Sequence, residues 1–167
     1  IYAHAIGKGP KKVLLWSQMH GNESTTTRAL FDLFKYLFST EGSKILEGLT
    51  LLIIPQLNPD GANAYTRLNA NSVDLNRDAN ALTQPESAAL KAIFDDFSPH
   101  FCFNLHGQRS IFAVGRMGKP ATLSFLSPAA DDGRSLTPAR LRAMQLIVTI
   151  HESLKDEIPH SIGRYND

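Results

Sequence analysis

The segment Leu49–Pro55 constrains the fold more than any other part of this chain. It reads LTLLIIP, and it lacks the alternation of apolar and polar residues that marks a strand with one face in water. Continuous apolar strands of this kind are typical of parallel sheets that carry helices on both faces. We therefore expect a strand that is buried on both sides, within an α/β fold.

The other regular segments fit such a sheet, because apolar runs of strand length alternate with stretches of helical periodicity. We expect strands over Ile1–Ile6, Lys12–Gln18 and His100–Leu105, shorter strands over Ser110–Val114 and Thr122–Phe125, and helices over Ser24–Phe38, Pro85–Phe97 and Thr137–Glu157. This order predicts a mixed, mostly parallel sheet flanked by helices. Residues 56–84 lack periodicity, and we expect them to form a long functional loop without regular structure.

Length and charge exclude several classes of protein. A chain of 167 residues with 43% hydrophobic residues is large enough for one domain, and we expect residues 1–167 to form it. The net charge of +1 is spread without a basic block, so we expect no nucleic-acid partner. No apolar run approaches the roughly 18 residues of a membrane helix, so we expect no membrane partner. The chain begins at Ile1 within a strand-like segment, so we expect a trimmed start and assign no localisation.

Two histidines and one glutamate follow predicted strands. His20 and Glu23 form His-x-x-Glu after one strand, and His106 follows another. Ligands in such sheets lie beyond the carboxyl ends of the strands, and two His with one Glu is a ligand set of catalytic zinc. A His-x-x-Glu pair alone is more often simply hydrogen-bonded, but the strand context and the third residue, His106, lead us to predict a site for one zinc ion. Cys102 lies about 13 Å from His106 along an extended strand, so we expect it to be a buried apolar residue instead of a ligand.

The long loop carries groups that suit an anion. Arg67 and Arg77 have fork-shaped guanidinium groups that match carboxylates, and Asn76 adds an amide beside Arg77. This combination predicts a pocket for a carboxylate. The alternative is that these arginines only solvate a surface loop.

Several motifs occur together in one order between Lys12 and His106. They are Gln18-Met-His-Gly-Asn-Glu23, Asn58-Pro-Asp-Gly61, Arg67, Asp74-Leu-Asn-Arg77 and Asn104-Leu-His106. This ordered set resembles the signature of the zinc metallocarboxypeptidases, also called funnelins. The resemblance implies a carboxypeptidase-like α/β/α fold and hydrolysis of the C-terminal peptide bond of a peptide.

The resemblance also implies a role for each matching residue. His20, Glu23 and His106 would bind zinc, and Asp74 would orient the first of these histidines. Arg67 would polarise the scissile carbonyl and stabilise the oxyanion. The C-terminal carboxylate of the substrate would be held by Asn76 and Arg77.

The family's catalytic glutamate, its general base, is not found in this chain. The glutamates after His106 are Glu152 and Glu157, which we expect on the surface of the last helix. We therefore expect the C-terminal part of the domain to be missing, and we predict zinc binding separately from activity, because a general base is commonly worth about 10²- to 10⁴-fold in rate. An exposed edge of the incomplete sheet would favour a homodimer.

Two alternatives remain open. The first is a zinc amidohydrolase of the succinylglutamate desuccinylase and aspartoacylase type, which acts on small acyl-amino acids and shares the His-Gly-Asn-Glu motif; Asn58-Pro-Asp-Gly61 favours the peptidase. The second is a noncatalytic module that binds zinc or peptide.

Gln108 and Arg109 follow the third ligand, where they would line a subsite or form a turn. The remaining histidines are expected to be structural or at the surface: His4, His100, His151 and His160.

Overall fold

The computed structural model describes residues 1–107, 113–114, 118–159 and 161–165. The chain divides into two compact units, Ile1–Gly107 and Gln108–Asp167. Among the described residues, no helix is both long and apolar enough to cross a membrane.

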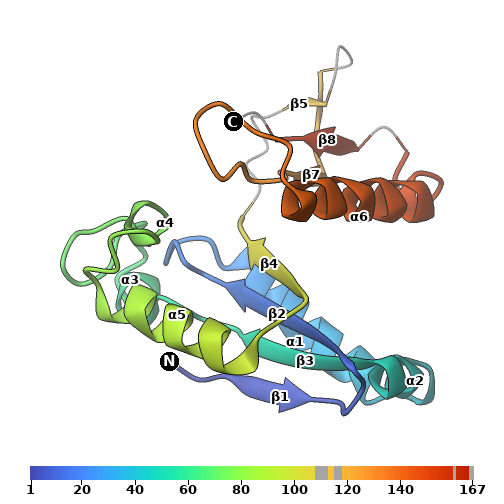
Figure 1. Ribbon diagram of the computed structural model, residues 1–167, viewed down its shortest axis with the longest axis horizontal. Coiled ribbons are helices and arrows are strands. Elements are labelled where there is room, and N and C mark those ends of the chain that lie inside the picture. Colours follow the sequence, from blue (N-terminus) through green and yellow to red (C-terminus); the bar gives the residue numbers. More distant parts are fainter. Residues whose placement is uncertain (108–112, 115–117, 160, 166–167) are drawn as a thin grey trace. The chain divides into compact units, whose positions relative to one another are not determined.

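The first unit is built on a four-stranded sheet with the order β1-β3-β2-β4 (Figure 1). β3, β2 and β4 run parallel to one another, and β1 pairs with β3 in the antiparallel sense. The mixed, mostly parallel sheet that the sequence predicts is therefore confirmed. The strands are β1 (His4–Ile6), β2 (Lys11–Ser17), β3 (Leu49–Ile54) and β4 (Phe101–Leu105).

Helices cover both faces of this sheet. α1 (Thr25–Leu37) packs Leu30 and Leu37 against one face, and α5 (Pro85–Phe97) packs its apolar side chains against the other. In β3, Ile53 belongs to the first of these clusters and Ile54 to the second, and neither side chain is exposed. The apolar run from Leu49 is thus buried on both sides, as predicted, because successive residues of the strand point alternately into the cores on the two faces of the sheet.

Three short helices were not predicted. α2 (Thr40–Gly48) follows α1, while α3 (Pro59–Asn63) and α4 (Leu75–Asp78) lie inside the stretch that we expected to lack regular structure. That expectation is wrong, because α3 and α4 are too short to show hydrophobic periodicity. Their starting signals are side-chain caps: Asn58 accepts a hydrogen bond from the N–H of Gly61 at 2.9 Å, and Asp74 from that of Asn76 at 2.9 Å.

Cys102 is exposed, which corrects the expectation that it is buried. β4 lies at the edge of the four-stranded sheet, and its alternate residues Phe101, Phe103 and Leu105 pack on the α1 side. Cys102 pairs with Leu14 and therefore points to the opposite face, where β4 is less covered. The alternation along an edge strand, and not the hydrophobicity of the thiol, decides its exposure.

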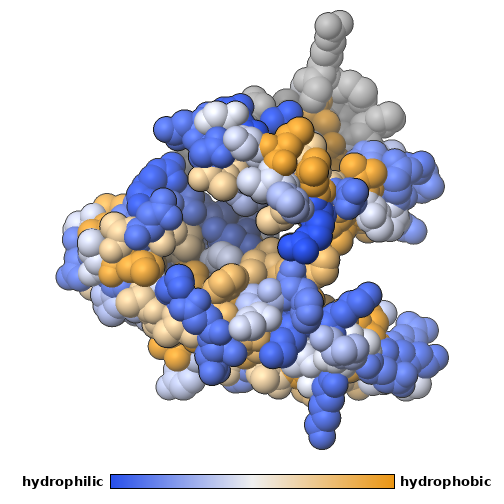
Figure 2. All heavy atoms as spheres, viewed as in Figure 1, coloured by the Kyte–Doolittle hydropathy of each residue, from blue (hydrophilic) through white to orange (hydrophobic). Residues whose placement is uncertain are grey.

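The second unit contains small sheets and one long helix. β7 (Leu123–Phe125) pairs in parallel with β8 (Ile162–Arg164), and β5 (Ala113–Val114) pairs antiparallel with β6 (Lys119–Pro120). Thr137 caps α6 (Pro138–Leu154) as predicted, although the helix ends before Glu157. Part of the strand predicted before Val114 lies outside the described residues. Hydrophilic and hydrophobic residues are interspersed over the face shown in Figure 2.

One buried carboxylate closes the loop that follows α4. Asp78 is 4% exposed and accepts hydrogen bonds from the backbone N–H groups of Thr83 and Gln84, both at 3.0 Å. The Thr83 hydroxyl also donates to it. These hydrogen bonds, that of the Thr83 hydroxyl first, lower the pKa of Asp78 from 3.8 to about 2.

We expect Asp78→Asn to remove an acid-dependent part of the stability. Because the folded pKa lies below the ordinary value, the ionised group stabilises the fold above about pH 4, and this contribution is lost as the pH falls toward about 2. Urea unfolding measured down to about pH 2.5 should show a shallower acid loss for Asp78→Asn than for the unmodified chain. Asp96→Asn, which changes an exposed carboxylate of α5, should retain the original slope. Equal slopes for Asp78→Asn and the unmodified chain would contradict this assignment.

Candidate metal centre

His20 is presented by a tight turn at the end of β2. The turn begins at Gln18, whose backbone is left-handed with a φ of 53°, and it closes with a hydrogen bond from the N–H of Glu23 to the carbonyl of His20 at 3.0 Å. His20 is 2% exposed. Its ring is therefore fixed by the fold, while Glu23 remains partly accessible.

Asn58 supports this turn through hydrogen bonds of its side chain. Its side chain is fully buried, donates to the carbonyl of Met19 at 3.2 Å and accepts from the N–H of Gly61. Gly21 packs directly against the backbone of Gly61, where a Cβ atom on Gly21 would lie 2.0 Å from the carbonyl carbon. The Asn-Pro-Asp-Gly motif thus supports the His-Gly-Asn-Glu motif through backbone contacts.

His106 reaches the same place from β4. Ser17 and Leu105 are paired in the parallel register of β2 and β4, so the two strands end at the same level. Nδ1 of His106 lies 3.0 Å from Oε2 of Glu23 and 3.2 Å from Nδ1 of His20. Nδ1 of His20 lies 2.9 Å from Oε1 of Glu23. One ligand atom from each residue lies within 4.8 Å of the others, so the structure brings the three predicted residues together.

The donors of this cluster fit a zinc ion. Two imidazole nitrogens and a carboxylate are typical zinc ligands, and bonds of about 2.0–2.1 Å in a tetrahedron would separate the donors by about 3.3 Å. The observed separations of 2.9–3.2 Å, in which Oε1 of Glu23 faces His20 and Oε2 faces His106, are close to that value. Two Nδ1 atoms that face each other share at most one hydrogen, whereas a common cation satisfies both lone pairs.

Asp74 contacts the other nitrogen of His20. Oδ1 of Asp74 lies 3.1 Å from Nε2 of His20, and Oδ2 accepts a hydrogen bond from Nε of Arg67 at 3.0 Å. Nη1 of Arg67 also lies 3.7 Å from Oε1 of Glu23. An acceptor at Nε2 places the ring hydrogen there, which leaves Nδ1 with its lone pair toward the cluster. The structure thus brings Asp74 and Arg67, both singled out from the sequence, to the side of this cluster.

Both carboxylates of the cluster stay ionised at neutral pH. Burial alone would raise the pKa of Glu23, but its close contacts with the rings of His106 and His20, together with the hydrogen bond from the N–H of Gly107, outweigh burial and hold the pKa well below the ordinary range. The pKa of Asp74 is also lowered, because hydrogen bonds from Asn76, Arg67 and His20 outweigh its desolvation. The cluster thus carries the negative charge that a dication requires.

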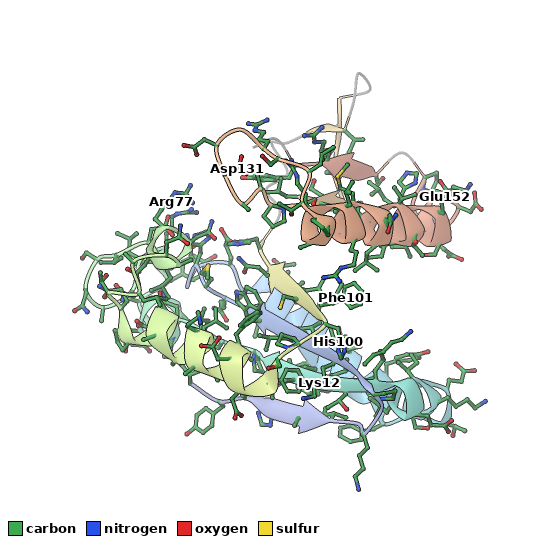
Figure 3. The ribbon with its side chains drawn as sticks, in the orientation of Figure 1. Lys12, Arg77, His100, Phe101, Asp131 and Glu152 are labelled. Carbon is green, nitrogen blue, oxygen red and sulfur yellow. The ribbon has the colours of Figure 1, made fainter. Side chains whose placement is uncertain are left out.

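The predicted carboxylate-binding residues lie on α4, which begins directly after Asp74. Asn76 is half-buried, and Arg77 is exposed at the surface, with Nη1 donating to the carbonyl of Asn76 at 3.3 Å (Figure 3). The Arg77 guanidinium therefore keeps further N–H groups directed to solvent.

The remaining predicted residues take structural or surface positions. Nδ1 of His100 accepts a hydrogen bond from the N–H of Lys12 at 3.0 Å, beside the start of β4 (Figure 3). Glu152 is exposed on α6 and pairs with Lys155, while Glu157 is exposed just after that helix. Gln108, Arg109 and His160 lie outside the described residues.

Two contributors to the site were not predicted. The N–H of Gly107 donates to Oε2 of Glu23 at 2.9 Å, and the side-chain amide of Gln18 donates a hydrogen bond to the carbonyl of Gly21 within the turn. The first is a backbone group that no side-chain pattern can indicate. The second depends on a left-handed backbone that only the folded chain reveals.

We expect Gly21→Ala to disrupt both the fold and the site, because the added Cβ would overlap the backbone of Gly61. The free energy of unfolding should fall by more than about 2 kcal/mol, since backbone cannot shift as a flexible side chain can. Gly48→Ala is the matched control: nothing lies within 4 Å of its Cβ position, and the stability should change by no more than about 1 kcal/mol. Denaturant titration of both variants tests this, and equal effects would contradict the close packing at Gly21.

Comparison with known proteins places this site in a family. The sequence model described as zinc carboxypeptidase matches residues 3–113. Carboxypeptidase 2 of Trichophyton rubrum is 32% identical over 114 residues, which cover 66% of this chain and 20% of that protein. Carboxypeptidase M of Mus musculus is 31% identical over 180 residues, which cover 82% of this chain and 39% of that protein.

Solved structures share the fold. A metallo-carboxypeptidase from Burkholderia cenocepacia superposes with a TM-score of 0.72 and 21% identity, over 99% of this chain and 45% of that one. A metallo-carboxypeptidase from Pseudomonas aeruginosa, in complex with (2-guanidinoethylmercapto)succinic acid, gives 0.70 and 22%, over 98% of this chain and 44% of that one. The expected carboxypeptidase-like fold is therefore confirmed.

The chain spans about a fifth of the length of the first curated relatives that it matches, 21% for the probable carboxypeptidase 2 of Trichophyton verrucosum. The family match nevertheless covers more than half of the chain and includes all three residues of the metal cluster. The chain belongs to the zinc carboxypeptidase family.

Proposed function

We propose that this chain carries the metal-binding and carboxylate-binding part of a metallocarboxypeptidase that hydrolyses the C-terminal peptide bond of a peptide. One observation carries the proposal: ligand atoms of His20, Glu23 and His106 lie within 4.8 Å of one another. They come from two strand ends that are far apart in sequence. Family membership supports zinc as the ion.

His20, Glu23 and His106 would hold the zinc. A zinc ion at this point would polarise a carbonyl group and lower the pKa of its bound water to about 7, which makes hydrolysis feasible at neutral pH. Asp74 would keep the hydrogen of His20 on Nε2, since it lies 3.1 Å from that atom. Loss of such a supporting contact typically weakens metal binding by about 10- to 100-fold.

Arg67 would act on the carbonyl oxygen of the scissile bond. Its Nε atom is tied to Asp74 at 3.0 Å, so the guanidinium plane is fixed while its side chain remains 42% exposed. The Nη groups, of which Nη1 also lies 3.7 Å from Oε1 of Glu23, would donate to an oxygen on which negative charge develops. A fixed cation with oriented N–H groups favours the oxyanion over the neutral carbonyl.

Asn76 and Arg77 would bind the C-terminal carboxylate of the substrate. The exposed fork of Arg77 can make two parallel hydrogen bonds to a carboxylate, which a lysine cannot. Because such a pocket requires a free carboxylate, it would select the end of a peptide over internal bonds. Substrate selection would then lie on α4 and hydrolysis at the strand ends.

The proton-transferring base of this reaction is not assigned to a described residue. Glu152 and Glu157 are exposed in the second unit, and Glu152 is already paired with Lys155 at 2.6 Å. Zinc binding, peptide binding and turnover are therefore three separate expectations with three separate tests.

We expect His20→Ala to abolish stoichiometric zinc binding. The purified chain should hold one zinc ion per molecule by elemental analysis, whereas His20→Ala should hold close to none, because a buried ligand that also positions Glu23 is lost. His151→Ala is the control, since it removes an exposed histidine of α6 and should leave the zinc content unchanged. Equal zinc content in the chain and in His20→Ala would refute the ligand assignment.

Replacement of Arg77 should weaken the binding of peptides with a free C-terminus. Hydrogen bonds to a charged group contribute about 1.5–3 kcal/mol, so Arg77→Ala should bind such a peptide roughly 10- to 150-fold more weakly. The C-terminally amidated peptide should bind the unmodified chain and Arg77→Ala equally weakly, and Arg28→Ala, which changes an exposed arginine of α1, should resemble the unmodified chain. Isothermal titration calorimetry gives these affinities, and undiminished binding by Arg77→Ala would contradict the role of α4.

The reaction itself is tested with two substrates on the protein in its full natural length. Release of C-terminal amino acids from peptides supports the proposal. Hydrolysis of N-acyl amino acids alone would favour the amidohydrolase alternative and contradict it. Zinc and peptide binding without either reaction would favour a noncatalytic binding module.

A further inference from the structure

Gln18 occupies an unusual position directly after β2. Its backbone is left-handed, with a φ of 53°, a conformation that residues other than glycine rarely adopt. Its side chain is nevertheless long, polar and only 5% exposed. A buried amide in a strained conformation persists only where surrounding contacts hold it.

The side-chain amide of Gln18 binds the turn that carries the metal ligands. Its Nε2 atom donates to the carbonyl of Gly21 at 2.7 Å, in the middle of the turn from His20 to Glu23. Its Oε1 atom accepts from the hydroxyl of Thr27 at 2.9 Å. The amide therefore connects this turn to the first residues of α1, and α1 in turn packs on the sheet.

The same group of hydroxyls reaches the strand that carries His106. Ser17 lies 2.7 Å from Thr27 and 3.1 Å from Thr26 through its hydroxyl, and Thr26 donates to the carbonyl of Leu105 at 3.2 Å. Leu105 directly precedes His106. A chain of hydroxyl contacts thus runs from the backbone beside one histidine to the backbone beside the other, and the single hydroxyl hydrogen of Ser17 bonds one of the two threonines at a time.

We propose that Gln18 is a positioning residue of the metal centre, which holds the turn from His20 to Glu23 in its metal-binding form before the metal arrives. The proposal rests on the proposed zinc site. The amide fixes the carbonyl of Gly21, and the left-handed backbone directs His20 inward toward Glu23 and His106. A turn held in this way loses less freedom on binding, so the metal binds more tightly.

A purely structural role for Gln18 gives a different expectation. If the amide only stabilised the fold, its removal would lower the unfolding midpoint of the metal-free chain and leave the zinc affinity of the folded chain unchanged. If it positions the turn, the metal-free chain still folds, and the folded chain binds zinc more weakly. The backbone of glycine adopts a φ of 53° without strain, so Gln18→Gly removes the amide and keeps the turn accessible.

Two variants and one control test the proposal. Gln18→Gly lacks the amide, and Gln18→Glu keeps its shape but replaces the N–H donor to Gly21 with a charged oxygen. A nearby negative charge alone would tighten zinc binding, whereas loss of the Gly21 hydrogen bond weakens it. Gln56→Ala is the control, because Gln56 is exposed and its Nε2 lies 3.5 Å from Oε1 of Gln18, the oxygen that does not bind the turn.

The zinc dissociation constant is measured by chelator competition on the full chain, with circular dichroism of the metal-free protein beside it. We expect Gln18→Gly to remain folded and to bind zinc roughly 10- to 100-fold more weakly, Gln18→Glu to bind more weakly than the unmodified chain, and Gln56→Ala to match it. In histidine-ring NMR spectra of the metal-free chain, Gln18→Gly should shift or broaden the signals of His20 and His106 and leave those of His151 unchanged.

Several results would overturn the proposal. They are an affinity of Gln18→Gly within about twofold of the unmodified chain, tighter binding by Gln18→Glu, unchanged ring signals of His20, or a metal-free Gln18→Gly that does not fold. Failure of the proposed function is a separate result, because the unmodified chain would then bind zinc no better than His20→Ala.

Discussion

The parallel pairing of β2 with β4 is the contact on which the site depends. Because Ser17 and Leu105 are partners in this register, the two strands end level with each other. His20 and His106, 86 residues apart in sequence, therefore meet at a separation of 3.2 Å. A register shift by one residue would turn one strand end away and separate the ligands. The apolar cores on the two faces of the sheet hold the register.

The segment between β3 and α5 completes the site from the other side. Asn58 and Gly61 support the turn of His20, and Asp74 caps α4 while it contacts the ring of the same histidine. One carboxylate therefore both starts the helix that carries Arg77 and contacts the ring of His20. Under the proposed function, this double use would link substrate binding to metal binding through Asp74.

Much of this arrangement could be predicted from sequence, because the informative signals were local. The apolar run at Leu49 indicated a buried strand, and His20, Glu23 and His106 stood at strand ends, where ligands of α/β sheets lie. The short helices α3 and α4 could not be predicted, because four or five residues are too few to show hydrophobic periodicity. The exposure of Cys102 could not be predicted because it depends on the position of β4 at the edge of the sheet. The contacts of Gln18 could not be predicted because they depend on its left-handed backbone. Tertiary context decides both.

Zinc X-ray absorption spectroscopy of the zinc-loaded chain is the sharpest test of the proposed metal centre, because it reports the ligand atoms themselves. We expect two histidine nitrogens at about 2.0–2.1 Å and carboxylate oxygen at about 2.0–2.2 Å. These signals should disappear in His20→Ala. A sulfur ligand at about 2.3 Å, which only Cys102 or a methionine could supply, or a spectrum without histidine, would contradict the assignment of His20, Glu23 and His106.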